Sequence, residues 1–127
     1  MIQSPTVNLR AGGLLPPRRA GKRGPPVLIQ QLGHVVLKVR ELARSEQFYG
    51  GVLGLLIVAR MAERQMTFFS LGHIHHDLAI QAVGIDAADA PARSPGLSHV
   101  AFKVGTSTDD LRRVHQYLME AGPPSFE

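Results

Sequence analysis

From about residue 30 onward, hydrophobic and polar positions fall into short blocks, each with the length of one secondary-structure element. Residues 32–39, LGHVVLKV, are rich in β-branched side chains and predict a strand. Residues 40–54 carry apolar side chains at mixed helical spacing up to Gly54, which predicts a helix. Further strands are predicted at 55–62, 66–72 and 75–83. The expected order is strand, helix, strand, strand, strand.

A second strand and helix follow a linker. Residues 84–96 are rich in Ala, Asp and Pro and predict an irregular connection. Residues 97–104, LSHVAFKV, predict a strand, and Thr108 is the expected cap of a helix over 109–122.

The two predicted strands are repeats of one another. Residues 32–39 and 97–104, which lie 65 positions apart, share five identities in eight: Leu32 with Leu97, His34 with His99, Val35 with Val100, Lys38 with Lys103, and Val39 with Val104. Recurrence of a strand-then-helix unit indicates two equivalent modules facing one another. We therefore expect an α+β domain over 27–127: a complete βαβββ module at about 30–83, a linker at 84–96, and a βα part of a second module at 97–122.

The basic charge of the chain belongs to its first 26 residues. These hold five basic residues and no acidic one, whereas the rest has nine basic and ten acidic residues, so the net charge of +4 divides into +5 and −1. Pro and Gly occur throughout 1–26, which predicts a flexible leader; a targeting peptide and a nucleic-acid arm are the alternatives. The body lacks a cationic excess and has 6% aromatic residues, so no nucleic-acid partner is expected.

Composition narrows the remaining classes of protein. No apolar run is long enough to span a bilayer, so no membrane partner is expected. The chain has no cysteine, which excludes disulfides and thiolate ligands and suits a cytoplasmic protein. Any metal must be held by His, Asp, Glu or water.

His34 and His99 are the first candidate functional residues. Side chains alternate across a strand, so each histidine lies opposite the bulkier apolar face that would pack under the helix. If the modules face one another, the two imidazoles converge in the cavity between them, as a metal site requires. The alternative is that each is a hydrogen-bonded residue at a strand end.

His76 is the third candidate. By alternation it shares a face with Leu78, Ile80 and Ala82 and can look into the same cavity, either as a ligand or as an acid/base beside a metal. His73 and His75 are expected to face solvent at the turn before the strand. His115 lies within the last predicted helix and receives no function.

Three segments in order carry a family resemblance: GHVVLKVRELARSEQFYGGVLGL, FFSLGHIHHDLAI and GLSHVAFKVGTSTDDL. Together they resemble the vicinal oxygen chelate superfamily of glyoxalase I, bleomycin-resistance proteins and extradiol dioxygenases, and most of all its catechol 2,3-dioxygenase-like branch. The resemblance implies paired βαβββ modules around a divalent metal. Fe(II) is the implied cofactor, with Mn, Zn or Ni as alternatives.

The same resemblance implies residue roles. His34 and His99 match the two histidine ligands of a 2-His-1-carboxylate site, and His76 matches the acid/base of the fourth strand. Leu78 occupies the position where the glyoxalase branch would supply a Glu ligand, which favours the dioxygenase-like branch. The carboxylate ligand of the family lies on a last strand that this chain does not contain. Glu127 follows Pro-Pro instead, so the role is not assigned to it, and a truncated second module is expected.

The function expected from these features is a metal-dependent extradiol-type ring-cleaving dioxygenase of a catecholic or similar small oxygenated substrate, or its inactive truncated form. A non-catalytic module that binds small molecules such as drugs is the alternative of a different class. A glyoxalase-like lyase or isomerase is the third, because one fold supports several chemistries. Homodimers are common in folds of this type, so a homodimer stands beside a monomer as an expected state.

Overall fold

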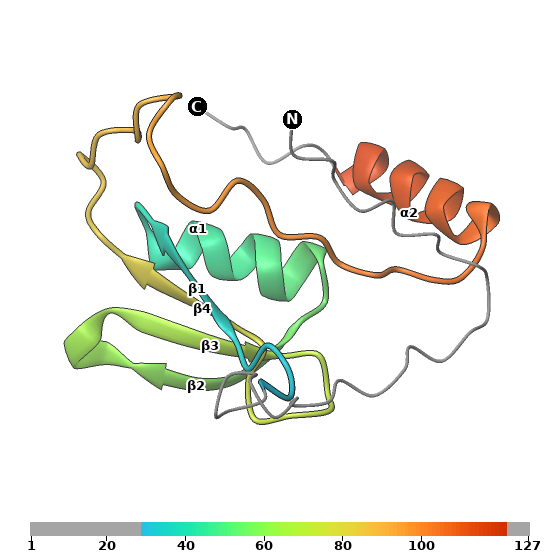
Figure 1. Cartoon of the computed structure of the whole chain (residues 1–127), viewed down its shortest axis with the longest axis horizontal. Coiled ribbons are helices and arrows are strands. Elements are labelled where there is room, and N and C mark those ends of the chain that lie inside the picture. The colour runs from blue at the N-terminus through green and yellow to red at the C-terminus, as the bar shows by residue number, and fades with distance from the viewer. Residues whose placement is uncertain (1–28, 122–127) are drawn as a thin grey trace, which may run out of the picture. The chain divides into compact units, whose positions relative to one another are not determined.

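The computed structural model describes residues 29–121, so the leader 1–26 and Glu127 lie outside the described residues. The chain divides after Leu32, and every element belongs to the part that begins at Gly33. Figure 1 labels the strands β1 (Val35–Val39), β2 (Leu56–Met61), β3 (Met66–Ser70) and β4 (Leu78–Ala82) and the helices α1 (Leu42–Glu46) and α2 (Thr108–Ala121). A π-helix at Gln47–Val52 and a 3-10 turn at Ala62–Arg64 complete the elements of the described residues.

The four strands form one mixed sheet in the order β1-β4-β3-β2. β1 runs parallel to β4, with Val35 opposite Leu78, and the pairs β4–β3 and β3–β2 are antiparallel. A parallel pair needs a long connection, which here consists of the helix and the β2–β3 hairpin. The βαβββ order of the first module and the α+β class are therefore confirmed.

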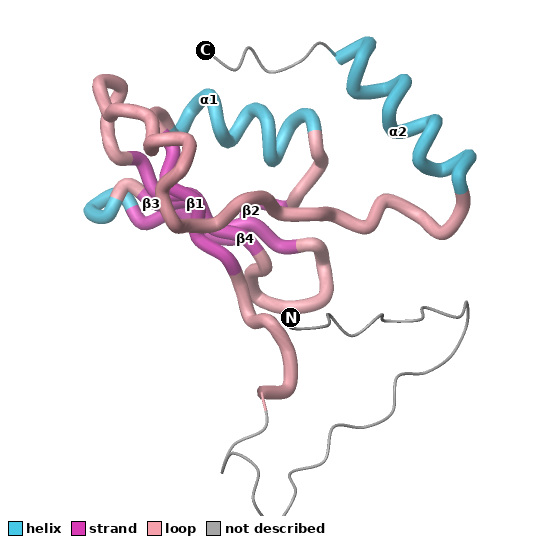
Figure 2. Tube along the Cα trace, turned by 45° about the horizontal axis from the view of Figure 1, so that its top comes forward, coloured by secondary structure: helices cyan, strands magenta, loops and turns pink. Residues whose placement is uncertain are grey.

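The core lies between this sheet and α1, which covers one face of the sheet (Figure 2). Phe69 and Ile80 are completely buried, and Leu55 and Leu78 are nearly so. Val35, Leu37 and Val39 pack against them from β1, while Val36 and Lys38 alternate to the exposed side. Because side chains of a strand alternate, the predicted apolar face of residues 32–39 is the one that faces α1.

The helix predicted at 40–54 consists of an α-helix followed by a π-helix. After five α-helical residues, the chain widens into the π-helix at Gln47–Val52, which contains Gly50 and Gly51. The Leu53 amide donates to the Phe48 carbonyl at 2.9 Å, one residue further back than in an α-helix. Gly54 then adopts a φ of 74°, a conformation that favours glycine, and turns the chain into β2.

A β-bulge in β2 directs Arg60 toward the helix. Ile57 pairs with Phe69 and Ala59 pairs with Phe68, so Val58 has no partner residue. The extra residue reverses the alternation along β2, so Arg60 lies on the same side as α1, next to its partner residue Thr67 of β3. There the Glu46 carboxylate accepts hydrogen bonds from Arg60 Nε at 3.0 Å and from Thr67 Oγ1 at 2.5 Å. This network fastens the end of α1 to the two hairpin strands.

The strand predicted at 97–104 is wrong for this structure. Residues 97–104 have no regular secondary structure, and most of them are exposed. A strand exists only through hydrogen bonds to a neighbour, and within the described residues all four strands pair among themselves. The second module therefore contributes a helix without the strand that was expected before it.

The helix after it is confirmed, but the predicted cap is not. Ser107, and not Thr108, caps α2: its Oγ accepts the Asp110 amide at 3.1 Å, and the Asp110 carboxylate accepts the Ser107 amide at 3.0 Å. This reciprocal arrangement is a capping box. The Asp110 side chain lies so close to Gly105 that any larger residue at position 105 would overlap it.

Candidate functional site

His34 lies directly before β1 and is exposed. It continues the alternation of Val36 and Lys38, the side chains of β1 that do not join the core under α1. The ring of His34 contacts that of His76, which in turn contacts Phe68, so His34 lies on the side of the sheet opposite the helix.

The loop between β3 and β4, residues 71–77, carries His73, His75 and His76 and is held by hydrogen bonds at both ends. Asp77 accepts the Leu71 amide through Oδ2 at 2.7 Å. Ser70 Oγ donates to the Ile74 carbonyl at 2.6 Å and accepts the Gly72 amide at 2.9 Å. These side-chain contacts close the loop on itself, so its imidazoles stand on a fixed backbone.

His76 stands at the centre of an aromatic cluster. Its ring centroid lies 4.5 Å from that of His34 and 5.1 Å from that of Phe68, which it meets edge to face. On its other side, His76 Nδ1 lies 2.8 Å from His75 Nδ1, a hydrogen-bonding distance. The structure thus brings together His34 and His76, two of the three predicted site residues.

The prediction that His76 shares a face with Leu78 and Ile80 is corrected by this geometry. Leu78 and Ile80 are buried in the core under α1, and β4 begins only at Leu78. The alternation of β4 does not continue into the loop before it, so the His76 side chain does not have to point to the face of Leu78 and Ile80. Its ring instead meets Phe68, which alternates with the buried Phe69 and lies on the side opposite the helix.

The environment lowers the pKa of His76. Burial is the largest cause, followed by the neighbouring imidazoles of His34 and His75, and Asp77 opposes them. A lowered pKa keeps the imidazole neutral near pH 7. A neutral imidazole can accept a proton or bind a metal, so the protonation state suits either role predicted for His76.

His99 stands apart from this cluster. It is exposed, and its Nδ1 lies 3.4 Å from Ser98 Oγ. Among residues 29–121, no hydrogen bond or ring contact joins it to His34 or His76, and no three His, Asp or Glu side chains gather in a group that could hold a metal ion. The pairing of His34 with His99 stays a prediction.

Sequence reasoning missed two neighbours of His76. Phe68 of β3 supplies a ring contact and His75 the hydrogen bond, and both depend on how the loop places His76. For Phe68 the available signal was its place next to the core residue Phe69, because adjacent side chains of a strand point to opposite faces. His73 is exposed, and the structure gives no role to it or to His115.

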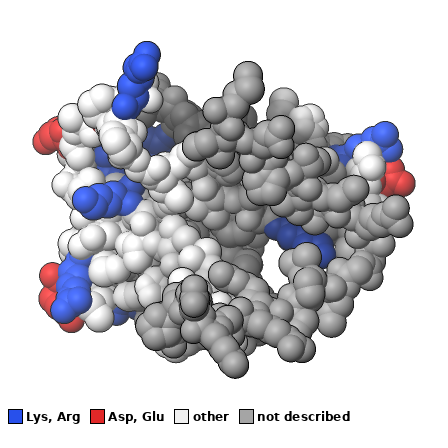
Figure 3. Space-filling model, in the orientation of Figure 1, with Lys and Arg blue, Asp and Glu red and all other residues white. Residues whose placement is uncertain are grey.

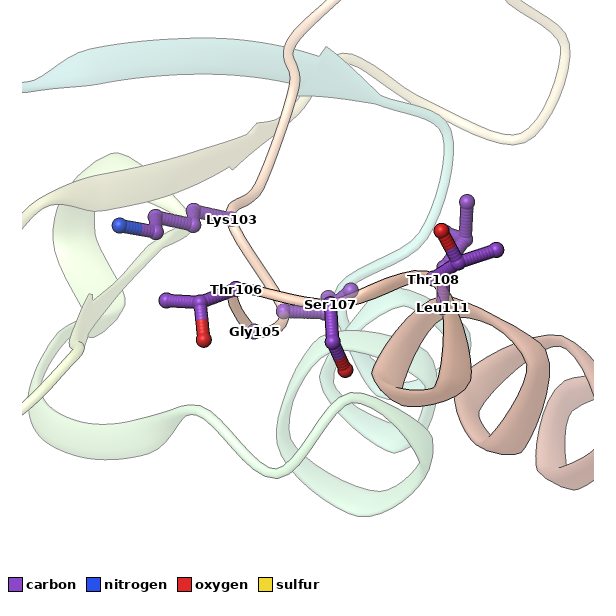
Figure 4. A pocket seen from close by; sticks show the side chains of 7 residues that line it. Lys103, Gly105, Thr106, Ser107, Thr108 and Leu111 are labelled. Atoms are coloured by element: carbon purple, nitrogen blue, oxygen red, sulfur yellow. The ribbon is translucent and has the colours of Figure 1, made fainter. Parts of the chain in front are cut away.

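An open depression of about 640 Å³ lies at the start of α2 and is separate from the histidines. Its walls come from residues 103–108 and Leu111. Figure 4 shows Lys103, Thr106 and Ser107 along the stretch that leads into the helix. All these side chains come from one short segment, so the depression is a local feature of the helix start.

On the face that Figure 3 shows, the charged side chains lie at separate places and do not form one patch, and acidic groups occur only at its margins. Several are paired in the structure, such as Arg40 with Asp89 and Arg112 with Asp109. Over residues 29–121, no helix has the length and apolar character needed to cross a bilayer.

Known proteins resemble this chain in sequence and in fold. The catechol-2,3-dioxygenase of Bacillus subtilis (strain 168) is 33% identical over 69 residues, which are 54% of this chain and 24% of that protein. The chain thus spans about a quarter of the length of this curated relative. An integron cassette protein from the mobile metagenome of Halifax Harbour Sewage Outfall has a similar crystal structure, with a TM-score of 0.55, 20% identity, and coverage of 74% of this chain and 72% of that one.

The decisive comparison is with protein families. The profile of the Glyoxalase/Bleomycin resistance protein/Dioxygenase superfamily matches residues 31–125, which include the whole sheet, the three site histidines and α2. The match agrees with the βαβββ order seen in the structure. The chain belongs to the Glyoxalase/Bleomycin resistance protein/Dioxygenase superfamily.

Proposed function

We propose that this chain carries the histidines of a metal-dependent, extradiol-type ring-cleaving dioxygenase that acts on a catecholic or similar small oxygenated substrate. In this proposal His34 and His99 bind Fe(II), and His76 is the acid/base. The observation that carries it is the contact between His34 and His76, whose ring centroids lie 4.5 Å apart on the side of the sheet opposite α1. The similarity to a catechol-2,3-dioxygenase supports the same reaction class.

The described residues do not by themselves form a full set of metal ligands. A 2-His-1-carboxylate site needs three side chains on one face of the ion. His34 lies beside His76, His99 makes no hydrogen bond or ring contact with either within residues 29–121, and no group of three potential ligands occurs there. The proposal therefore requires His99 to approach His34 and a carboxylate to come from elsewhere.

The residues around His76 suit a phenolic substrate. A neutral imidazole accepts a proton from a hydroxyl group placed about 2.6–3.2 Å away. Phe68 is half-buried and Val36 is exposed, so both offer apolar surface on the same side of the sheet. An aromatic ring lying on this surface would bring a hydroxyl within reach of His76, while His34 stands beside it.

The test is ring cleavage by protein loaded anaerobically with Fe(II) and then exposed to oxygen with a panel of catechols. We expect a yellow ring-cleavage product from the wild type, none from His34→Ala, and a rate lower by about 10²–10⁴ from His76→Gln. His73→Gln, a substitution in the same loop, is the matched control and should retain activity. Full activity in His34→Ala would refute the assignment of the site.

A second candidate is a small-molecule binding module that uses no metal. The lack of a three-ligand group among the described residues favours it. It predicts that catechols or related aromatic compounds raise Tm equally with and without a chelator, because binding to the native state stabilises it regardless of metal. In the dioxygenase proposal, a chelator abolishes the shift.

A further inference from the structure

Two adjacent histidines in the β3–β4 loop share a hydrogen bond that the proposed function does not use. His75 Nδ1 and His76 Nδ1 lie 2.8 Å apart, and the planes of the two rings are inclined at 83°. For two neutral imidazoles, one of these nitrogens must carry the hydrogen and the other must present its lone pair. The contact therefore couples the tautomer of one ring to that of the other.

The tautomer of His76 decides what its second nitrogen can do. A neutral imidazole has one N–H and one lone pair, and the hydrogen bond made by one nitrogen fixes the state of the other. If His76 Nδ1 holds the hydrogen, Nε2 is a base. If Nδ1 accepts instead, Nε2 carries the hydrogen and cannot accept a proton.

The surroundings hold both rings in place. Ser70 and Asp77 fasten the loop through side-chain hydrogen bonds at 2.6–2.9 Å. The ring of His76 contacts the rings of both His34 and Phe68. His75 is exposed, so an N–H on its Nε2 can bond to water, whereas the ring of His76 is half-buried and gains more from a protein acceptor for its single N–H.

We propose that His75 is a positioning residue that accepts the Nδ1–H of His76 and thereby leaves the lone pair of His76 Nε2 facing the substrate. The catalytic consequence rests on the proposed role of His76 as acid/base. The tautomer itself does not, because it is a property of the protein without metal or substrate.

The primary experiment measures tautomers directly in the metal-free, uniformly ¹⁵N-labelled full chain at pH 8, where histidine is neutral. Long-range ¹H–¹⁵N correlation distinguishes the Nδ1–H from the Nε2–H form, and His76→Gln identifies the signals of His76 by their loss. We expect the Nδ1–H form to dominate in the wild type. His75→Ala should lower the ratio of the Nδ1–H to the Nε2–H form about fivefold, the worth of one hydrogen bond.

Two further variants separate positioning from a general loss of structure. His75→Asn should restore the Nδ1–H form, because the Asn side-chain oxygen can occupy the place of the His75 Nδ1 acceptor. His73→Ala, in the same loop, should leave the ratio unchanged. The proposal is overturned if His76 is Nε2–H in the wild type, or if His75→Ala leaves the ratio as it was.

Activity then tests the catalytic consequence. With an active wild type, His75→Ala should lower kcat about fivefold with KM nearly unchanged, and His75→Asn should recover it. Unchanged kcat in His75→Ala would overturn the positioning role. If the tautomer shifts as expected while the wild type cleaves no catechol, the hydrogen bond stands and the proposed dioxygenase function fails.

Discussion

Residues 32–39 and 97–104 share five of eight side chains, yet one segment contains a strand and the other does not. β1 has β4 beside it and α1 over its apolar face, and Val35, Leu37 and Val39 pack into the core. The repeated segment leaves Phe102 and Val104 exposed, at 37% and 46%. The difference shows that this sequence motif can form a strand, and that it does so where another strand lies beside it and pairs with it.

The largest expected effect on stability comes from removing one aromatic ring from each of the two regions. Phe69→Ala should lower the free energy of unfolding by about 3–5 kcal/mol, because the ring is completely buried and leaves a cavity. Phe102→Ala should cost about 0.5 kcal/mol or less, as surface substitutions do. Urea denaturation measures both. Equal losses would mean that residues 97–104 are packed in solution.

The next test removes the hydrogen bonds that Glu46 makes with Arg60 and Thr67 in the first module. Glu46→Gln should cost about 1–2 kcal/mol at pH 7, because Glu46 accepts hydrogen bonds from Arg60 and Thr67. The Arg60 hydrogen bond lowers the pKa of Glu46, the Thr67 bond adds to this, and burial opposes it.

The pH dependence of the same variant follows from that lowered pKa. A carboxylate whose folded pKa is depressed stabilises the fold above its unfolded pKa, and this contribution is lost as the pH falls through the folded value. Urea midpoints of wild type and Glu46→Gln should therefore differ at pH 7 and converge below about pH 4. A constant difference down to pH 3 would show that the charge of Glu46 is not involved.

The smallest effect concerns the start of α2. Ser107→Ala should weaken the helix by about 1 kcal/mol, because Ser107 Oγ accepts the Asp110 amide. Thr108→Ala is the matched control and should have little effect, since Ser107 is the cap. Hydrogen exchange of the amides in the first turn of α2 measures the effect of both substitutions. Faster exchange in Thr108→Ala alone would restore the cap predicted from sequence.

Sequence patterns located the elements of the first module because its strands are short apolar blocks, and in β1 burial also alternates along the strand. The apolar parity of Val35, Leu37 and Val39 reports which face of β1 meets α1. Such patterns record only whether a side chain can be buried. They do not record whether a partner is present, which is why the same parity at 97–104 predicted a strand that the structure lacks.

The errors at the candidate site have similar local causes. The prediction extends alternation from Leu78 back to His76, but the strand begins at Leu78, and before it the loop backbone sets the direction of the ring. Ser107 and Thr108 are both good caps, and the acidic residue three positions after Ser107 was the signal that distinguishes them. The His75–His76 hydrogen bond depends on loop torsions that no periodicity encodes.

The bulge in β2 also determines where this sheet can grow. β1 and β2 are its outer strands within residues 29–121, and an exposed strand edge invites association with other chains. At Val58 the bulge interrupts the regular ladder of β2, so an incoming strand would meet donors and acceptors out of step. The ladder of β1 is regular throughout, so any association by strand addition, whether productive assembly or aggregation during storage, is directed to β1.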